Sequence, residues 1–301
     1  LTVLDLPPGV QVALDERMGT GGPVVTGRPI FWRKTLRPLR ATGWGNTEVL
    51  AEISQADRKA PHPGPVDNRF LGLLAEPQVL TLEFGEPLPE ASVLLAEGWV
   101  EYGYSQTVFA AWQAGIQYDP PDLAARRADG TWVTVEAHFG YPAGMPRQMT
   151  LPLQNLPAGT TALRLTSNME IYWDEIQVVQ EIARPESVTS KTLQPEIARV
   201  ARTGFALRTN GPQRVPYYDY ETRSPYWDTK SLRGFYSALG NVHPLVTKAD
   251  GALAIIGGGE EIHLEFGAPA PPADGYTRHF VVDFRGWAKD MDLYTTDGET
   301  V

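Results

Sequence analysis

The sequence contains no cysteine among its 301 residues. Disulfide bonds, thiolate metal sites, iron–sulfur clusters and cysteine nucleophiles are therefore excluded. It also has no excess of positive charge, because its formal net charge at pH 7 is −10. Binding to phosphate groups needs clustered Lys and Arg side chains. The charge therefore argues against nucleic acid as a main partner and against adsorption to an anionic membrane surface.

Long apolar runs are also missing, so we predict no insertion into a membrane. The first residues, LTVLDLPPG, lack the basic start and apolar core of a signal peptide and have the pattern of a strand. We therefore expect the sequence to be a mature or partial form. The five histidines are dispersed and have none of the close spacings of zinc ligands. The sequence of residues 290–300 does not match the EF-hand pattern, because Tyr294 and Thr295 stand where an oxygen ligand and a glycine are required.

Turn-forming and aromatic residues are abundant. The chain has 29 Gly, 26 Pro and 10% aromatic residues, a composition typical of short strands joined by tight loops. The segment VLTLEFG at 79–85 alternates between apolar and polar residues, and Asp129-Gly130 is a hairpin signal. About eight candidate strands lie between residues 77 and 180, a spacing typical of a β-sandwich or jelly roll.

A four-residue phrase, LEFG, occurs twice, at 82–85 and at 264–267. Each copy leads through a Pro-rich turn and an apolar strand to Gly-Trp, ending at Trp99 and Trp287, which favours a core role for both indoles. We therefore expect an all-β protein of two β-sandwich, jelly-roll-like modules with long Pro/Gly-rich loops. The first spans 1–182, a polar Pro-containing linker spans 183–199, and the second spans 200–301 and is expected to be incomplete at its C-terminus.

Two clusters of aromatic residues are the candidate ligand-binding groups. The residues are Trp99, Tyr102, Tyr104, Trp112, Tyr220, Tyr226 and Trp227. Exposed Trp and Tyr rings stack on the apolar faces of sugars, and their polar edges hydrogen-bond hydroxyl groups. The alternative is that these rings fill cores and interfaces. The basic segment 28–46 is expected to be a loop packed on the sandwich, and the alternative is a patch that binds an anion or a partner.

Catalytic signatures are weak. Glu97 and Glu101 share one face of a predicted strand and could form a carboxylate pair, but an acidic chain offers such pairs by chance. The segment GYSQT around Ser105 lacks the second glycine of a nucleophile elbow and is expected to lie in a strand. We expect a protein without catalytic activity, while a polysaccharide-active enzyme remains an alternative.

Several phrases occur in a characteristic order: GWVEYGYSQTVFAAWQAG, DLAARRADGTWVTV, GYPAGMPRQMTLPL, SNMEIYWDEIQVV and YYDYETRSPYW. In this order the chain resembles the C-terminal region of bacterial exported proteins that carry FG-GAP repeats, and often an ASPIC/UnbV segment or tetratricopeptide repeats. The resemblance implies a β-rich, non-catalytic protein that is extracellular, periplasmic or attached to the cell surface. Such proteins have an upstream β-propeller with calcium loops, and this chain contains no FG-GAP repeat.

The phrase MEIYWDEIQVV also resembles the closing strand of galactose-binding-like jelly rolls. This resemblance implies that Asp174 is a ligand of a structural calcium ion, and no other cofactor is expected. The alternative is an Asp that caps a strand end or pairs with an Arg.

Together these features predict an exported, non-catalytic binding module that recognises a glycan or a protein surface. The alternative of a different class is a structural subunit of a larger cell-surface or extracellular assembly.

Overall fold

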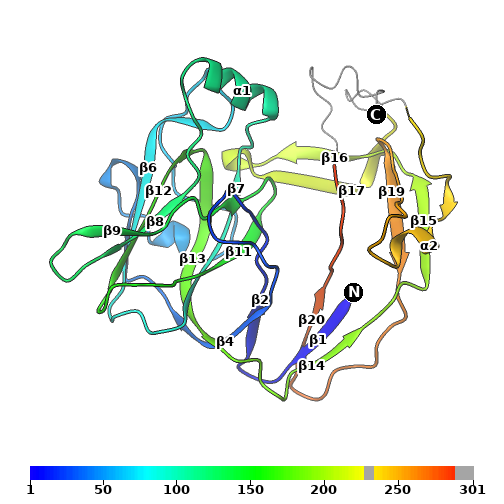
Figure 1. The fold of residues 1–301 in the computed structure, drawn as a ribbon, viewed down its shortest axis with the longest axis horizontal. Coiled ribbons are helices and arrows are strands. Elements are labelled where there is room, and N and C mark those ends of the chain that lie inside the picture. The colour runs from blue at the N-terminus through cyan, green and yellow to red at the C-terminus, as the bar shows by residue number, and fades with distance from the viewer. Residues whose placement is uncertain (227–233, 289–301) are drawn as a thin grey trace. The chain divides into compact units, whose positions relative to one another are not determined.

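A computed structural model describes residues 1–226 and 234–288 of the chain (Figure 1). Antiparallel β-strands dominate these residues, which confirms the all-β class. In this part of the chain no helix has both the length and the apolar character needed to cross a bilayer. The chain divides into two compact units. We call Val10–Arg184 with Asn210–Pro216 the sandwich unit, and Leu1–Gly9, Pro185–Thr209 and Tyr217–Val301 the small-sheet unit.

The sandwich unit consists of two five-stranded sheets. The β7 sheet has the order β11-β7-β13-β4-β2, and the β6 sheet has the order β5-β6-β12-β8-β9. The strands are β2 (Gln11–Ala13), β4 (Ile30–Leu36), β5 (Arg40–Thr42), β6 (Leu73–Glu83), β7 (Ser92–Val100), β8 (Asp122–Arg126), β9 (Trp132–Glu136), β11 (Arg147–Pro152), β12 (Ala162–Met169) and β13 (Ile171–Ile182).

Short elements connect these strands. They are the paired strands β3 (Arg17–Met18) and β10 (Tyr141–Pro142), the helix α1 (Ser105–Gln113), and the 3₁₀ turns η1 (Trp44–Asn46), η2 (Ala51–Ile53) and η3 (Pro212–Arg214).

The core of the sandwich lies between its sheets because strand residues alternate between the two faces. Leu80 and Leu82 of β6 and Leu163 and Leu165 of β12 face Leu94 and other apolar side chains of the β7 sheet. The outward positions of β6 and β12 are polar or only partly buried. This alternation is the pattern that the sequence shows at 79–85, and it gives the β6 sheet one buried and one accessible face.

The β7 sheet is instead buried on both faces. A second apolar cluster on its outer side contains Trp32, Val93 and Leu95. A third contains Trp99, Tyr172 and Val215. Strand β7 is accordingly an almost continuous apolar run in which Glu97 is the one residue that is not buried.

Two local predictions have opposite outcomes. Strands β8 and β9 form a hairpin around Asp129-Gly130, where Gly130 has φ +86°, so this prediction is confirmed. The segment after β7 was expected to continue as strand, and that prediction is wrong, since residues 105–113 form α1.

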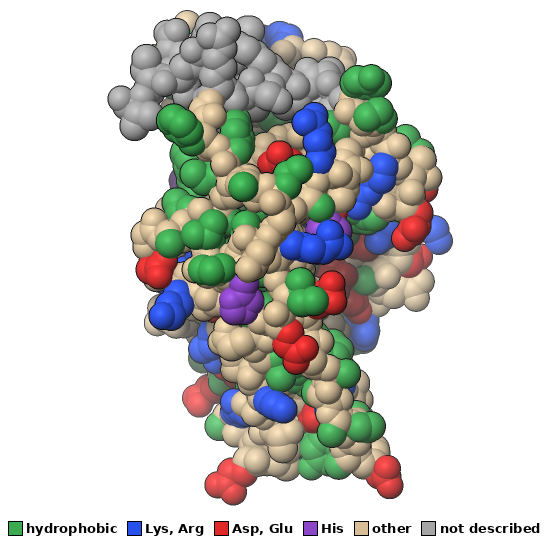
Figure 2. Space-filling model, turned by 90° about the vertical axis from the view of Figure 1, so that its right-hand side faces the viewer, with side chains coloured by type: hydrophobic (Ala, Val, Ile, Leu, Met, Phe, Trp, Pro, Cys, Tyr) green, Lys and Arg blue, Asp and Glu red, His purple; other side chains and the backbone are tan. Residues whose placement is uncertain are grey.

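The described residues of the small-sheet unit form three sheets. One has the order β14 (Thr189–Thr192), β1 (Thr2–Leu6), β20 (Thr277–Val281), and another β18 (Gly240–Asn241), β15 (Ile197–Arg202), β19 (Glu260–Glu265). The third pairs β16 (Phe205–Asn210) with β17 (Pro216–Ser224), and α2 spans His243–Val246. A small core surrounds Ala198, Val200 and Val242. On the face shown in Figure 2, hydrophobic side chains are interspersed with charged ones.

The units differ from the predicted module boundaries. Leu1–Gly9 belongs to the small-sheet unit because β1 pairs with β14 and β20 there. The expected linker 183–199 contains β14 and the start of β15.

The repeated LEFG…GW frame has one structural parallel. In each copy the two strands, β6 and β7 or β19 and β20, lie in different sheets. The core role expected for both terminal Trp residues is wrong for one of them: Trp99 is 1% exposed, whereas Trp287 is 85% exposed and follows β20 outside any strand.

Candidate functional site

A run of exposed, large apolar side chains in the sandwich unit lies on and just before α1. It comprises Tyr102, Tyr104, Val108, Phe109 and Trp112, which we call the α1 surface. Trp112 is 63% exposed and Tyr104 is 55% exposed. In Figure 1, α1 stands at one end of the sandwich, beyond the strands. An exposed set of large apolar side chains is a feature of interaction sites on soluble proteins.

The local sequence explains why a helix forms here. Tyr104 has extended backbone angles and precedes the first helical residue, and Ala110 and Ala111 favour helix. Gly115, with φ +74°, ends the helix in a Schellman arrangement. In that arrangement Gly115 N–H donates to Trp112 O over 3.0 Å, and Ile116 N–H donates to Ala111 O over 2.9 Å. Ala111 is the one buried helix residue, so the other side chains of α1 remain available for contact.

The aromatic rings of the α1 surface form two contacting pairs. Phe109 and Trp112 stack with centroids 5.6 Å apart, and Tyr102 and Tyr104 meet edge to face at 6.0 Å. Residues 103–118 contain no charged side chain in a chain of net charge −10. Contact with an apolar partner there would therefore bury aromatic area without desolvating any charge.

Three of the predicted ligand-binding residues, Tyr102, Tyr104 and Trp112, belong to this surface, and a fourth does not. Trp99 stacks on Tyr172 at 5.5 Å and its Nε1–H donates to Gln213 O over 2.8 Å. Its ring has no exposed face on which a sugar could stack. The prediction for Trp99 is corrected accordingly: Gly98-Trp99 continues a strand whose outer face is covered by residues around Ala60 and Val215.

The other predicted aromatic cluster lies in the small-sheet unit. Tyr220 is on β17, where its ring stacks on that of Tyr218 at 6.3 Å and lies beneath Arg223 at 5.4 Å. Tyr226 follows that strand and is 82% exposed. Trp227 lies outside the described residues.

Asp174, the implied calcium ligand, binds backbone N–H groups. Its side chain is buried on β13, and its two oxygens accept hydrogen bonds from the N–H groups of Asp57, Arg58 and Lys59 over 2.9–3.3 Å. Burial raises the pKa of Asp174, and these donors oppose that effect. Among residues 1–226 and 234–288, no group of three or more His, Asp or Glu side chains is placed to hold a metal ion. Asp174 lies within β13 and holds a distant loop through its backbone N–H groups, so it neither caps a strand end nor pairs with an Arg side chain of the described residues, the two alternatives named above.

The candidate carboxylate pair is held by separate partners. Glu97 accepts a hydrogen bond from Gln148 Nε2 over 3.1 Å, and burial raises its pKa. Glu101 forms an ion pair with Arg214 at 3.8 Å. Ser105 is the first residue of α1 and not a strand residue as expected.

The basic segment 28–46 forms strands and not the expected loop. It includes β4 and β5, and four of its five cations pair with acidic side chains. The pairs are Arg28–Glu181, Lys34–Glu86 at 2.9 Å, Arg37–Glu175 at 2.9 Å and Arg40–Glu83 at 3.7 Å. These pairs neutralise the positive charge locally, which weakens the interpretation as an anion-binding patch.

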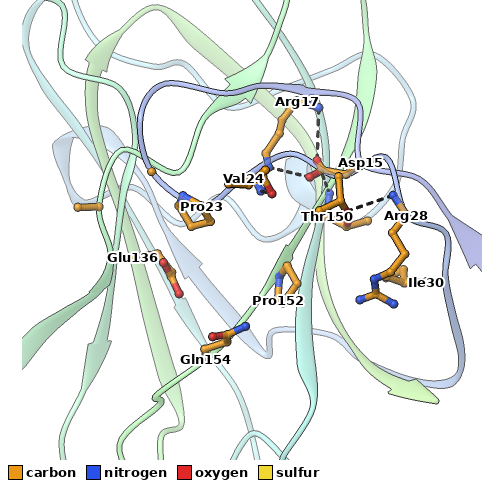
Figure 3. A pocket seen from close by; sticks show the side chains of 13 residues that line it. Asp15, Arg17, Pro23, Val24, Arg28, Ile30, Glu136, Thr150, Pro152 and Gln154 are labelled. Carbon is orange, nitrogen blue, oxygen red and sulfur yellow. Dashed lines mark hydrogen bonds and ion pairs between the residues drawn. The ribbon is translucent and has the colours of Figure 1, made fainter. Parts of the chain in front are cut away.

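A pocket of about 620 Å³ lies beneath the loop that precedes β4 (Figure 3). Arg17 and Asp15 point toward each other in it and form an ion pair at 2.8 Å. Arg17 also donates to Phe139 O and Val24 O, so its charge holds the loop in place. The carboxylate of Glu136, on the opposite wall, has no hydrogen-bond partner among the described residues, and burial raises its pKa. The ion pair of Arg17 with Asp15 and the hydrogen bonds of Arg17 therefore stabilise the fold.

Sequence reasoning missed Phe109 and Val108, which complete the α1 surface. The available signal was the uncharged stretch 103–118, with adjacent alanines and a glycine at the position that ends a helix.

No protein-family model matches the chain, and a search of curated proteins finds no significantly similar sequence. The resemblance to exported FG-GAP and ASPIC/UnbV proteins therefore stays a prediction based on the order of short phrases.

Proposed function

We propose that the sandwich unit is a non-catalytic binding module that contacts a glycan or protein surface through the α1 surface. The observation that carries this proposal is the exposure of Tyr102, Tyr104, Phe109 and Trp112 on one short helix and its lead-in. Leaving these rings in water has a cost in free energy, roughly 25 cal/mol for each Å² of apolar area that a partner could cover.

The geometry favours a protein partner over a sugar at this surface. The rings project from a helix, and neither the pocket of Figure 3 nor the second pocket described below is lined by them. Aromatic side chains on a helix that enter an apolar groove are a common mode of protein recognition. If the contact between the α1 surface and its protein partner is permanent, the chain is a structural subunit of an assembly. If that contact is transient, the chain is a binding module.

The test compares two charge insertions at equally exposed sites. Trp112→Asp alters the α1 surface, and Leu39→Asp, at a residue that is 66% exposed in the same unit, is the matched control. Each full-length variant is produced at native level in its own cells, and the proteins that co-purify with it are quantified by mass spectrometry. We expect specific partners to be retained by the wild type and by Leu39→Asp and to be lost with Trp112→Asp.

A glycan array probed with the same three proteins separates the two ligand classes. Array binding that Trp112→Asp abolishes would replace the protein partner with a glycan at the same surface. If Trp112→Asp and Leu39→Asp behave alike in both assays, the α1 surface is not the binding site.

An exported location and membership of the FG-GAP/ASPIC-UnbV group remain part of this proposal, supported by the phrase order quoted above. Fractionation of the source cells tests the location. Recovery of the protein from the cytoplasm alone would contradict it.

A further inference from the structure

A second pocket, of about 500 Å³, lies on the accessible face of the β6 sheet. We call it the sheet-face pocket, and the residues used below are Thr42, Trp44, Glu76, Thr81 and Arg164. They come from β5, η1, β6 and β12 and all belong to the sandwich unit. The volume is within the range of about 300–1,000 Å³ typical of small-molecule sites.

Arg164 carries a positive charge that the protein does not compensate. Its side chain is partly buried, and it forms no hydrogen bond or ion pair with the residues that the structure describes. The nearby carboxylate of Glu83 is taken by Arg126 at 3.0 Å and by Arg40 at 3.7 Å. Burial and the charge of Arg126 lower the pKa of Arg164. A partly buried guanidinium without an acceptor favours the approach of an anion.

The guanidinium of Arg164 is nevertheless held in one position. It lies over the ring of Trp132 at 3.8 Å. Strand β8 lies between β12, which carries Arg164, and β9, which carries Trp132. The β8 residue that pairs with Arg164 is Ala124, and its small side chain leaves room for the contact with Trp132. A cation fixed against an indole loses little conformational entropy when it binds an anion.

Trp44 forms a fixed aromatic wall of the same pocket. Its Nε1–H donates to Glu76 Oε1 over 2.7 Å, and its ring packs so closely on Gly64 that a Cβ there would lie 3.1 Å from Cδ1. The indole is still 38% exposed. A rigid indole with an accessible face can stack on the C–H face of a sugar ring.

The charges around the pocket define the class of ligand. There is one uncompensated cation, an aromatic wall, and the hydroxyl groups of Thr42 and Thr81. A phosphate dianion would need more than one cation, whereas a single carboxylate matches one guanidinium. We propose that the sheet-face pocket binds a hexuronate residue of an acidic glycan, with its carboxylate on Arg164 and its ring on Trp44.

The test is calorimetric titration of the intact chain with a galacturonate trimer and with a glucuronate-containing hyaluronan tetramer. The methyl ester of the galacturonate trimer is the matched ligand, because it keeps the rings and removes the charge. We expect saturable binding of at least one acid, and binding that is about tenfold or more weaker after Arg164→Gln or Trp44→Ala. Binding should also weaken as salt is added.

Arg40→Gln is the control variant, since Arg40 lies on the same sheet outside the pocket and its side chain is 70% exposed. Its affinity should equal that of the wild type. If Arg164→Gln fails to fold, the comparison of acid and ester on the wild type decides. Failure of the folded wild type to bind either acid, equal binding of the ester, or an unchanged affinity of Arg164→Gln would overturn the proposal.

This proposal is independent of the α1 surface. Trp112→Asp is expected to leave uronate binding unchanged, so either proposal can fail without the other.

Discussion

Replacement of Trp99 by Ala should destabilise the protein far more than replacement of Trp112 by Ala, although both residues were candidates for ligand binding. Trp99 is 1% exposed, stacks on Tyr172 and donates a hydrogen bond to Gln213 O. Truncation of a buried Trp costs about 3–5 kcal/mol, and the lost hydrogen bond adds about 1 kcal/mol. We therefore expect Trp99→Ala to lower the free energy of unfolding of the sandwich unit by about 4–6 kcal/mol.

Trp112→Ala should change the same quantity by less than about 0.5 kcal/mol, because its ring is mostly in water. Trp99→Phe is the graded variant, since it keeps a stacked ring and loses the indole N–H. Urea denaturation followed by near-ultraviolet circular dichroism measures all three. A cost below about 1 kcal/mol for Trp99→Ala, or equal costs for the two alanine variants, would refute this assignment of roles.

Two further predictions concern buried carboxyl groups. Asp174→Ala should lower the free energy of unfolding by about 2–4 kcal/mol, because it leaves three backbone N–H groups without their acceptor. Addition of calcium or of a chelator should leave the melting temperature of the wild type unchanged. A calcium-dependent shift in melting temperature that Asp174→Ala removes would restore the metal-ligand interpretation. Burial raises the pKa of Glu97 in the folded state, so its stabilising contribution is present below the unfolded pKa of about 4.3 and is lost as pH rises through the folded value. Glu97→Gln should therefore raise the free energy of unfolding at pH 7 by no more than about 1 kcal/mol, given solvent screening, and this gain should vanish near pH 4. Thermal melts of both proteins between about pH 4 and pH 7 measure the gain. A gain that is constant with pH would contradict the prediction.

Strand alternation and turn chemistry made much of the sandwich unit predictable. The β8–β9 hairpin follows from Asp129-Gly130, and the inward leucines of β6 follow from period-two alternation at 79–85. The helix α1 was not predicted because residues 105–113 include Thr107, Val108, Phe109 and Trp112, β-branched and aromatic residues that fit a strand as well as a helix. The decisive signal was Gly115, which ends the helix with positive φ.

Burial of individual aromatic residues could not be predicted from the repeat. Trp99 and Trp287 follow the same phrase, yet one is covered by residues far away in the sequence and the other is exposed. Similarly, Trp44 and Arg164 are 120 positions apart in numbering and lie in one pocket because β12 pairs with β6 beside β5. The spacing of residues in the sequence does not predict contacts between strands that depend on the order of strands in a sheet.

The central claim is that the α1 surface is where the sandwich unit meets its partner. The most direct measurement places a photo-crosslinking benzophenone side chain at position 112 or at position 39 of the full chain, produced at native level in its own cells. The claim predicts a discrete protein adduct from position 112 and none from position 39. No adduct at position 112, or the same adducts from both positions, would contradict it.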